Sequence, residues 1–442
     1  MRTLNPDTAG IDISSREHYV AVPEGRSEKT VHRFDGFTSD LHRIAKFLKT
    51  CRVKSVVMES TGVYWFHLYT VLLDYGFEVL LVNARHVKNV PGKKSDVSDA
   101  RWLQQLHSFG LLNGCFQPDN LTRELRTFVR QRKTITADMT TEVQRMQKAL
   151  ELMNIKLNNV IRDIQGKTGR EIIQAILDGE RNPRVLASHR DGRIKASRKV
   201  LIESLNGEWR EDQLFNLKQA WDKHEFLKSQ LEDCHARCER TMEKMSLDGP
   251  HPKKKKIKMR RGQKNTPNFN VAQMTYDILG VDPTTIYGIS GTTALTILSE
   301  TGPNLKEKFP SQKQFLSWLN LVPKNNITGG KVISSRVTPK KNRAGQAFRD
   351  AASGLWNAKN PLGDYLRRKK AKSGAAKAVV ATARKIAVIY YKMVTDMVEF
   401  DPAHIENRSK LYLEHRAKNL QKALDRTKRL ISDFQDFDRV VI

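Results

Sequence analysis

Apolar and polar residues follow a short-range alternation in the first 110 residues. Runs rich in β-branched and aromatic residues, bounded by turn-forming residues, predict strands at 8–13, 19–22, 31–34, 55–58 and 77–82. Apolar residues three and four positions apart predict helices at 40–50, 64–75 and 98–109. The predicted order is three strands, a helix, a strand, a helix, a strand and a helix.

This order of elements is that of the RNase H-like fold, in which three strands form a meander and α/β units follow. In such a sheet the first and fourth strands are neighbours, and the last helix packs across their ends. We therefore expect an α/β N-terminal domain of RNase H-like (RuvC-like) type, followed by a mostly α-helical remainder.

The pattern changes from Leu121 to long helical stripes. Apolar residues stepping by three, four and seven predict helices over 121–157 and 217–245, suited to a coiled coil or a helical hairpin. The two stripes can pair within one chain or between subunits. We expect an RNase H-like domain, a coiled-coil region with a basic linker, a helical C-terminal domain with a glycine-rich interruption at 324–345, and a charged C-terminal helix, over 1–116, 117–270, 271–400 and 401–442.

Charge is distributed unevenly along the 442 residues. The chain has 77 Lys and Arg against 48 Asp and Glu, a net charge of +29. Residues 1–118 carry 15 basic and 12 acidic groups, 119–265 carry 33 and 21, and 266–442 carry 29 and 15. The excess of positive charge in the last two thirds predicts a polyanionic partner, and nucleic acid fits best.

Composition also predicts the compartment. No run of 18 apolar residues is present, and the first residues contain no apolar signal region. The four cysteines are too few and too scattered for a disulfide framework. We expect a cytoplasmic protein.

Four acidic residues of the nearly neutral first third occupy positions that suit a metal site. Asp12 lies in the first predicted strand, Glu59 ends the fourth, and Asp96 and Asp99 lie three apart at a helix start. The strand order brings these carboxylates together, and paired carboxylates favour Mg²⁺ or Mn²⁺. Alternatively, Asp96 and Asp99 are a helix cap and a first-turn acid.

The set Asp12, Glu59, Asp96 and Asp99 resembles the Asp-Glu-Asp-Asp quartet of insertion-sequence transposases with a RuvC-like domain, the insertion sequence one-ten family. Lys94-Ser95-Asp96-Val97-Ser98-Asp99-Ala100 is similar to that family's last acidic motif. The resemblance implies that all four residues are catalytic and bind the metal ion.

Two motifs in the C-terminal half extend the resemblance. Gly288, Ser290 and Gly291 resemble the family's helix-hairpin-helix-like opening, where free backbone N–H groups meet phosphate. A plain turn between two helices explains this piece equally well.

Further on, Thr328 precedes Gly329-Gly330-Lys331, at the position where the family usually has a nucleophilic serine. Ser334 and Ser335 are alternative nucleophiles, and a loop that only follows the phosphate backbone is a third interpretation. Nearby cations predicted to contact nucleic acid are Lys331, Lys340, Lys341 and Arg343.

The resemblance implies a transposase or recombinase that breaks and rejoins DNA, guided by a structured RNA and acting as a dimer or tetramer. Since the quartet and Thr328 lie in different predicted domains, we expect a composite site. Two other functions stay open. One is a metal-dependent nuclease or junction resolvase, and the other is an inactive nucleic-acid-binding derivative.

Overall fold

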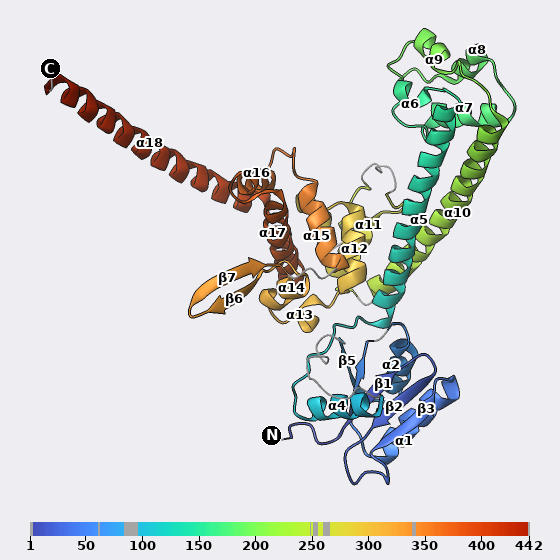
Figure 1. Ribbon diagram of the computed structural model, residues 1–442, viewed down its shortest axis with the longest axis vertical. Coiled ribbons are helices and arrows are strands. Elements are labelled where there is room, and N and C mark those ends of the chain that lie inside the picture. Colours follow the sequence, from blue (N-terminus) through green and yellow to red (C-terminus); the bar gives the residue numbers. More distant parts are fainter. Residues whose placement is uncertain are drawn as a thin grey trace. The chain divides into compact units, whose positions relative to one another are not determined.

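The computed structural model describes residues 3–60, 62–83, 96–247, 249–250, 255–259, 266–337 and 342–440, without the side chains of 96, 404, 408, 409 and 432–440. The chain divides into two compact units, Met1–Gln117 and Pro118–Ile442. Figure 1 labels the helices and strands of both units.

The first unit is built on a five-stranded mixed sheet. Its elements are β1 (Thr8–Ile13), β2 (Glu17–Ala21), β3 (Val31–Asp35), α1 (Thr38–Thr50), β4 (Ser55–Glu59), α2 (Trp65–Asp74), β5 (Glu78–Val82) and α4 (Asp96–Ser108). The strand order is β3-β2-β1-β4-β5. The first three strands are antiparallel, whereas β4 runs parallel to both β1 and β5. This topology confirms the predicted element order and fits an RNase H-like domain.

Helices cover both faces of this sheet (Figure 1). Ile11 and Ile13 of β1 belong to one core together with Ile44 of α1 and Leu68 of α2. Successive residues of a strand face opposite sides, so Gly10 and Asp12 face the other layer. That second layer is α4, whose Leu103 packs against β4 and β5.

The second unit contains two long helices that pair antiparallel. They are α5 (Asn120–Leu152) and α10 (Glu211–Leu247). Arg132 Nε of α5 donates to His235 Nε2 of α10 at 2.9 Å, and Glu142 of α5 binds Lys223 of α10 at 2.7 Å. Residue numbers rise along one helix as they fall along the other. The two predicted stripes therefore pair within one chain, while a supercoiled heptad packing stays a prediction.

The first stripe is shorter than the sequence pattern indicates. The prediction of one helix over 121–157 was wrong at its end, because α5 stops at Leu152 and Asn154 adopts a left-handed φ of 57°. Met153, Ile155 and Leu157 instead pack into a core that they share with the first turns of α10. Apolar spacing alone continues through this turn, so it gave no stop signal.

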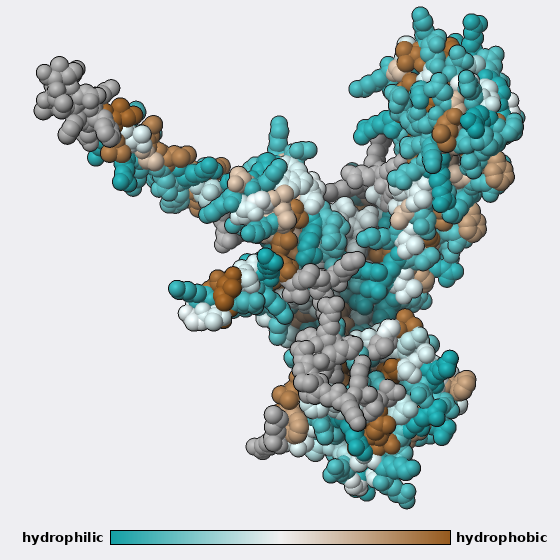
Figure 2. Space-filling model, viewed as in Figure 1, coloured by the Kyte–Doolittle hydropathy of each residue, from teal (hydrophilic) through white to brown (hydrophobic). Residues whose placement is uncertain are grey.

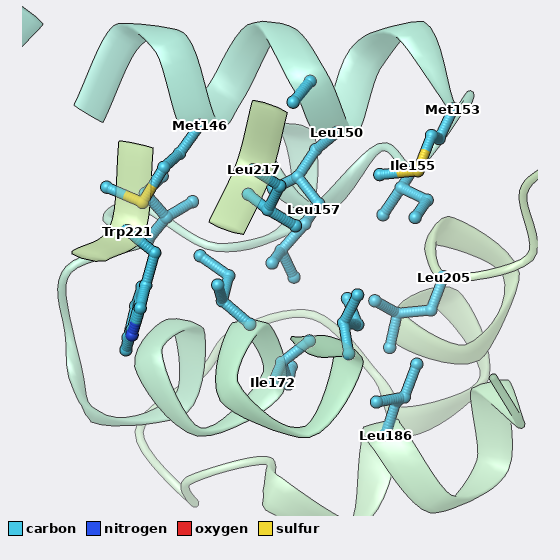
Figure 3. Close-up of a cluster of buried hydrophobic side chains, with 14 of the residues drawn as sticks. Met146, Leu150, Met153, Ile155, Leu157, Ile172, Leu186, Leu205, Leu217 and Trp221 are labelled. Carbon is cyan, nitrogen blue, oxygen red and sulfur yellow. The ribbon is translucent and has the colours of Figure 1, made fainter. Parts of the chain in front are cut away.

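Short helices cover the end of the helix pair at which α5 stops and α10 begins. They are α6 (Leu157–Val160), α7 (Lys167–Leu177), α8 (Pro183–Leu186) and α9 (Arg198–Ser204). Their apolar side chains meet those of α5 and α10 in one buried cluster, which includes Met146, Ile172, Leu186, Leu217 and Trp221 (Figure 3). The cluster shows that 166–210 is a folded cap of short helices.

The remaining elements are mainly helical. They are α11 (Val271–Leu279), α12 (Gly291–Thr301), α13 (Leu305–Lys308), α14 (Gln312–Trp318), β6 (Lys324–Thr328), β7 (Lys331–Arg336), α15 (Arg343–Ser353), α16 (Pro361–Ser373), α17 (Ala375–Asp396) and α18 (Pro402–Val440). Phe315, Phe348 and Tyr390 bring α14, α15 and α17 into one aromatic core. Among the helices described, none combines the length and the apolar character needed to cross a membrane.

Candidate active site

Asp12 and Glu59 lie side by side near the carboxyl ends of the neighbouring strands β1 and β4, and we call this end of the two strands the acidic edge of the sheet. Strands β1 and β4 are parallel, with Ile11 paired to Met58, so the next residues in register are Asp12 and Glu59. Since Ile11 and Met58 point into the core under α1 and α2, the two acidic residues point to the opposite face. Both are half-buried.

Helix α4 lies closely on that face because Gly10 has no side chain. A Cβ at Gly10 would come within 2.4 Å of Ala100 O and Gln104 N. At the amino-terminal ends of β1 and β4, Gln104 Nε2 donates to Thr8 O at 3.4 Å, and His107 Nε2 lies 2.9 Å from Ser55 Oγ. The helix therefore runs antiparallel to β1 and β4, and its first turn reaches the strand ends that carry Asp12 and Glu59.

Asp99 is in that first turn and is half-buried. It precedes Leu103 by one helical turn, and Leu103 packs against Val57 and Val82. Asp99 therefore lies on the helix face that meets the sheet, near the carboxyl ends of β1 and β4. Asp96 begins α4 one turn earlier, and its side chain lies outside the described residues.

The chemistry of this edge suits a hard divalent cation. Carboxylate oxygens are the ligands that Mg²⁺ and Mn²⁺ prefer in proteins. Among the described side chains, which leave out that of Asp96, no three or more metal-ligating groups form a cluster able to hold an ion. The backbone framework thus brings the positions of the quartet to one edge, and their binding of an ion stays a prediction.

Thr328 lies at the tip of a β-hairpin. Strands β6 and β7 are joined by Gly329 and Gly330, with Thr328 paired to Lys331. The two glycines have φ values of 54° and 77°, the left-handed values that a tight two-residue hairpin turn requires. The glycine-rich interruption of the helices that was predicted at 324–345 therefore contains a β-hairpin over 324–336. The Gly-Gly pair flanked by polar strands was a usable hairpin signal.

The hairpin is exposed over nearly its whole length. Thr328, Gly329, Gly330 and Lys331 are all exposed, so the Thr328 hydroxyl is open to a large substrate. Apolar side chains are also exposed here, at 59%, 54% and 70% for Ile327, Val332 and Ile333. Figure 2 shows apolar surface on this hairpin.

The alternative nucleophiles lie farther from the turn. Ser334 pairs with Asn326 and Ser335 with Asn325, on the returning strand. The register shifts between Asn326 and Ile327, so Ile333 forms a bulge between the turn and these serines. Thr328 is thus the hydroxyl residue next to the turn, whereas Ser334 and Ser335 are set back along β7.

The start of α15, the helix that follows the hairpin in the chain, is joined to the end of α14. Asn342 caps this helix by accepting from Gly345 N at 2.8 Å, and its amide donates to Trp318 O at 2.7 Å. Arg343, the first residue of α15, is exposed. Lys340 and Lys341, also predicted to bind nucleic acid, lie outside the described residues.

The predicted phosphate-binding turn before α12 is well defined. Ser290 is exposed and caps the helix, accepting from Thr293 N at 3.2 Å. Gly288 has a φ of 91°, and a Cβ there would come within 2.6 Å of Ala351 O. Gly288 is therefore required by packing against α15, and Gly291 opens the helix beside Val271. Phosphate binding at this helix start stays a prediction.

One charged cluster was not predicted from the sequence. Glu300, at the end of α12, is buried and accepts two hydrogen bonds from Arg130 of α5, at 2.9 and 2.8 Å. Arg126 of α5 lies 3.3 Å from the same carboxylate, and burial lowers the pKa of its guanidinium. The cluster fixes α12 to the long helix pair. Arg126 and Arg130 resemble ordinary surface cations of a long helix, so the sequence carries no signal for it.

Two family models match the chain in these regions. A transposase model for the Asp-Glu-Asp-Asp domain of IS110 elements matches residues 9–155, which include all of the sheet except Thr8 and the whole of α5. A second model, described as transposase IS116/IS110/IS902 family, matches residues 284–361, which include α12, the hairpin and α15. Among curated proteins, no sequence matches this chain.

Proposed function

Because this chain belongs to the IS116/IS110/IS902 family of insertion-sequence transposases, we propose that it cuts and rejoins DNA with a metal-binding quartet and a threonine nucleophile. The quartet is Asp12, Glu59, Asp96 and Asp99, and the nucleophile is the hydroxyl of Thr328. The observation that carries the proposal is the placement of Asp12, Glu59 and the first turn of α4 at one sheet edge.

The quartet residues would hold Mg²⁺ or Mn²⁺, which when bound supplies positive charge to a phosphate and lowers the pKa of an attacking group. The chain contributes carboxylates whose backbone positions are set by the register of β1 with β4 and by the packing of α4 on Gly10. Such preorganisation means that the negative charges are held together before substrate arrives.

Thr328 contributes the covalent step. Its Oγ1 forms a bond to phosphorus while the bond from phosphorus to the leaving sugar oxygen breaks, and the proton of the hydroxyl passes to that oxygen or to water. The reverse exchange with a second strand end restores the hydroxyl and rejoins DNA. The methyl group of threonine crowds the attack, and exposure at the hairpin tip gives the phosphate room to approach.

Cations near Thr328 would bind the phosphate backbone. Lys331 pairs with Thr328 across the turn, and both Lys331 and Arg343 are exposed. They neutralise charge that develops on the phosphate during attack. The net charge of +29 supports a larger nucleic-acid surface, and we include a structured guide RNA as the component that selects the target by base pairing, by analogy with other guided systems.

The decisive experiment looks for a covalent protein–DNA product. Purified protein with its bound RNA is mixed with labelled element-junction DNA and Mg²⁺, separated on a denaturing gel, and the adduct is mapped by peptide mass. We expect an adduct at Thr328 in the parent protein and in Thr328→Ser, and none in Thr328→Val, which keeps the shape and removes the hydroxyl.

Matched variants on the sheet complete the test. We expect Asp12→Asn to abolish cleavage and Asp35→Asn, the same change at an exposed position of β3, to leave it unchanged. An adduct at Ser334 or Ser335 would overturn the assignment of Thr328. Cleavage without any adduct would instead establish a metal-dependent nuclease, and binding without cleavage would establish an inactive derivative.

A further inference from the structure

Helix α18 carries an apolar stripe that nothing in its own chain covers over the described residues. Every side chain from Lys410 to Ile431 is exposed. Leu413, Leu420, Leu424 and Ile431 are between 49% and 60% exposed, and Figure 2 shows apolar surface recurring along this helix. A single helix with no packed face is marginal in water, so a partner that covers the stripe would stabilise it.

The contacts that α18 does make lie in its first third. The Tyr287 hydroxyl is 3.2 Å from Glu406, and the Arg368 guanidinium lies 4.3 Å from the ring centre of Tyr412. These contacts hold the base of the helix against α16 and the turn before α12. They leave the stripe beyond Tyr412 available.

The stripe has the spacing of a coiled-coil seam. Its residues follow one another at intervals of four, three, four, three and four: Leu413, Ala417, Leu420, Leu424, Thr427 and Ile431. Such a 4-3 repeat keeps one face of a helix turned toward a similar helix along its length. In heptad terms Ala417, Leu424 and Ile431 are a positions, and Leu413, Leu420 and Thr427 are d positions.

We propose that α18 pairs with α18 of a second copy of this chain as an antiparallel coiled coil centred near Lys422. In this register each a position meets a d position. Leu424 packs against Leu420 of the partner subunit, and Ile431 packs against Leu413 of the partner subunit. Ala417 lies opposite Thr427 of the partner subunit. The same patch serves both copies, as a two-fold interface requires.

Charge favours this direction over the parallel one. In the antiparallel register, Glu414 beside the seam faces Lys428 of the partner subunit, and the two charges are of opposite sign. Gln421 faces Gln421 of the partner subunit. In a parallel pair, Lys410 occupies an a position and would meet Lys410 of the partner subunit within the seam. Burying two like charges in the seam is unfavourable, whereas the antiparallel alignment separates them.

Cysteine crosslinking in the full chain tests both the surface and the direction. Ala417→Cys and Thr427→Cys are prepared singly, with different tags, and also co-expressed as a pair. We expect disulfide dimers from the co-expressed pair at about ten times the yield of either variant alone. The parent protein, whose Cys51, Cys234 and Cys238 are buried, and Lys422→Cys on the outer face are the controls.

Self-crosslinking of Ala417→Cys alone would show a parallel pair and overturn the antiparallel register. Equal yields from the pair and from Lys422→Cys would overturn the interface. Both outcomes are read without DNA, RNA or metal ion, so failure of this proposal is distinct from failure of the proposed function.

A matched pair of charge variants measures the contribution of the seam. Leu420→Glu places a carboxylate in the seam, and Asn419→Glu places the same group one residue away on the outer face. By sedimentation equilibrium, we expect the dimer dissociation constant to rise about a hundredfold for Leu420→Glu and less than threefold for Asn419→Glu. Circular dichroism at high protein concentration checks that both fold. Equal dissociation constants for the two variants would overturn the proposal.

Discussion

The two candidate reactive regions of this transposase are built in opposite ways. At the sheet edge, Asp12 and Glu59 sit on paired strands beneath a helix that approaches within the space left by Gly10. At the hairpin, Thr328 is exposed beside a turn where a Cβ added at Gly329 or Gly330 would meet no described atom within 4 Å. One region is packed between a strand pair and a helix, and the other is a hairpin exposed over nearly its whole length.

The difference matches the demands of the two roles proposed for them. Carboxylates that share a metal ion repel each other when it is absent, so the surrounding fold must hold them together. A nucleophile that becomes bonded to DNA must reach a bulky phosphate and later release it. A short exposed hairpin gives that access with few contacts to break.

The largest expected effect comes from filling the space at Gly10. In Gly10→Val, the added side chain meets the backbone of Ala100 and Gln104, which cannot move aside without shifting α4. We expect a loss of about 3 kcal/mol in the unfolding free energy of the first unit and loss of cleavage. Urea unfolding followed by circular dichroism measures the first quantity.

Gly192→Ala is the control, since a Cβ at Gly192 meets no atom within 4 Å. Full stability and full cleavage in Gly10→Val would show that α4 does not need its close approach, and the contrast between the two regions would fail.

A smaller effect is expected at the hairpin turn. In Gly329→Val, a β-branched residue is forced to a φ of 54°, which costs about 1–2 kcal/mol locally. Because few contacts depend on the turn, global stability should change by less than about 0.5 kcal/mol, while adduct formation falls about tenfold. Gly329→Asn, which tolerates a left-handed φ, should retain most of the adduct.

Single-turnover kinetics of adduct formation, together with thermal unfolding, measure both quantities. A large fall in the unfolding temperature of Gly329→Val would show that the hairpin is integrated into the fold, contrary to the comparison.

The smallest effect concerns pH and is confined to the sheet unit. Burial lowers the pKa of His107, which lies in the last turn of α4 with its Nε2 2.9 Å from Ser55 Oγ. The folded state therefore binds a proton less readily than the unfolded state, whose histidine titrates near 6.5. As pH falls below about 6.5, the unfolded state gains protons first, so the stability of this unit decreases with falling pH.

Replacing this group with His107→Gln should flatten the dependence of unfolding temperature on pH below 6.5. His67→Gln, at an exposed position of α2, should leave that dependence unchanged. If the two variants gave the same pH profile, protonation of His107 would not be what loosens α4.

Much of the sheet unit was predictable because its pattern is local. Strands such as β1 and β4 are short apolar runs, and their order along the chain is enough to indicate which are neighbours. Asp12 and Glu59 stood out because each carboxylate follows or interrupts such a run. Gly10 did not stand out, since its importance depends on a helix about 90 residues later that comes to lie against it.

The hairpin and the Glu300 cluster show two other limits. At 324–336 the strands are exposed and polar, so they lack the apolar alternation by which strands are usually found. Arg126 and Arg130 are separated from Glu300 by about 170 residues. A long-range ion pair of this kind leaves no spacing to detect.

The sequence by itself determined the family, the element order of the sheet unit and the large positive charge, and it predicted the acidic quartet and the hydroxyl nucleophile before Gly329-Gly330. These are properties of residue identity and short-range periodicity. Tertiary structure decided that α5 and α10 pair within one chain, that Gly10 admits α4 to the acidic edge, and that Thr328 sits at an exposed hairpin tip. Those facts depend on which distant segments share space, because packing and hydrogen bonding act between residues that the chain order keeps apart.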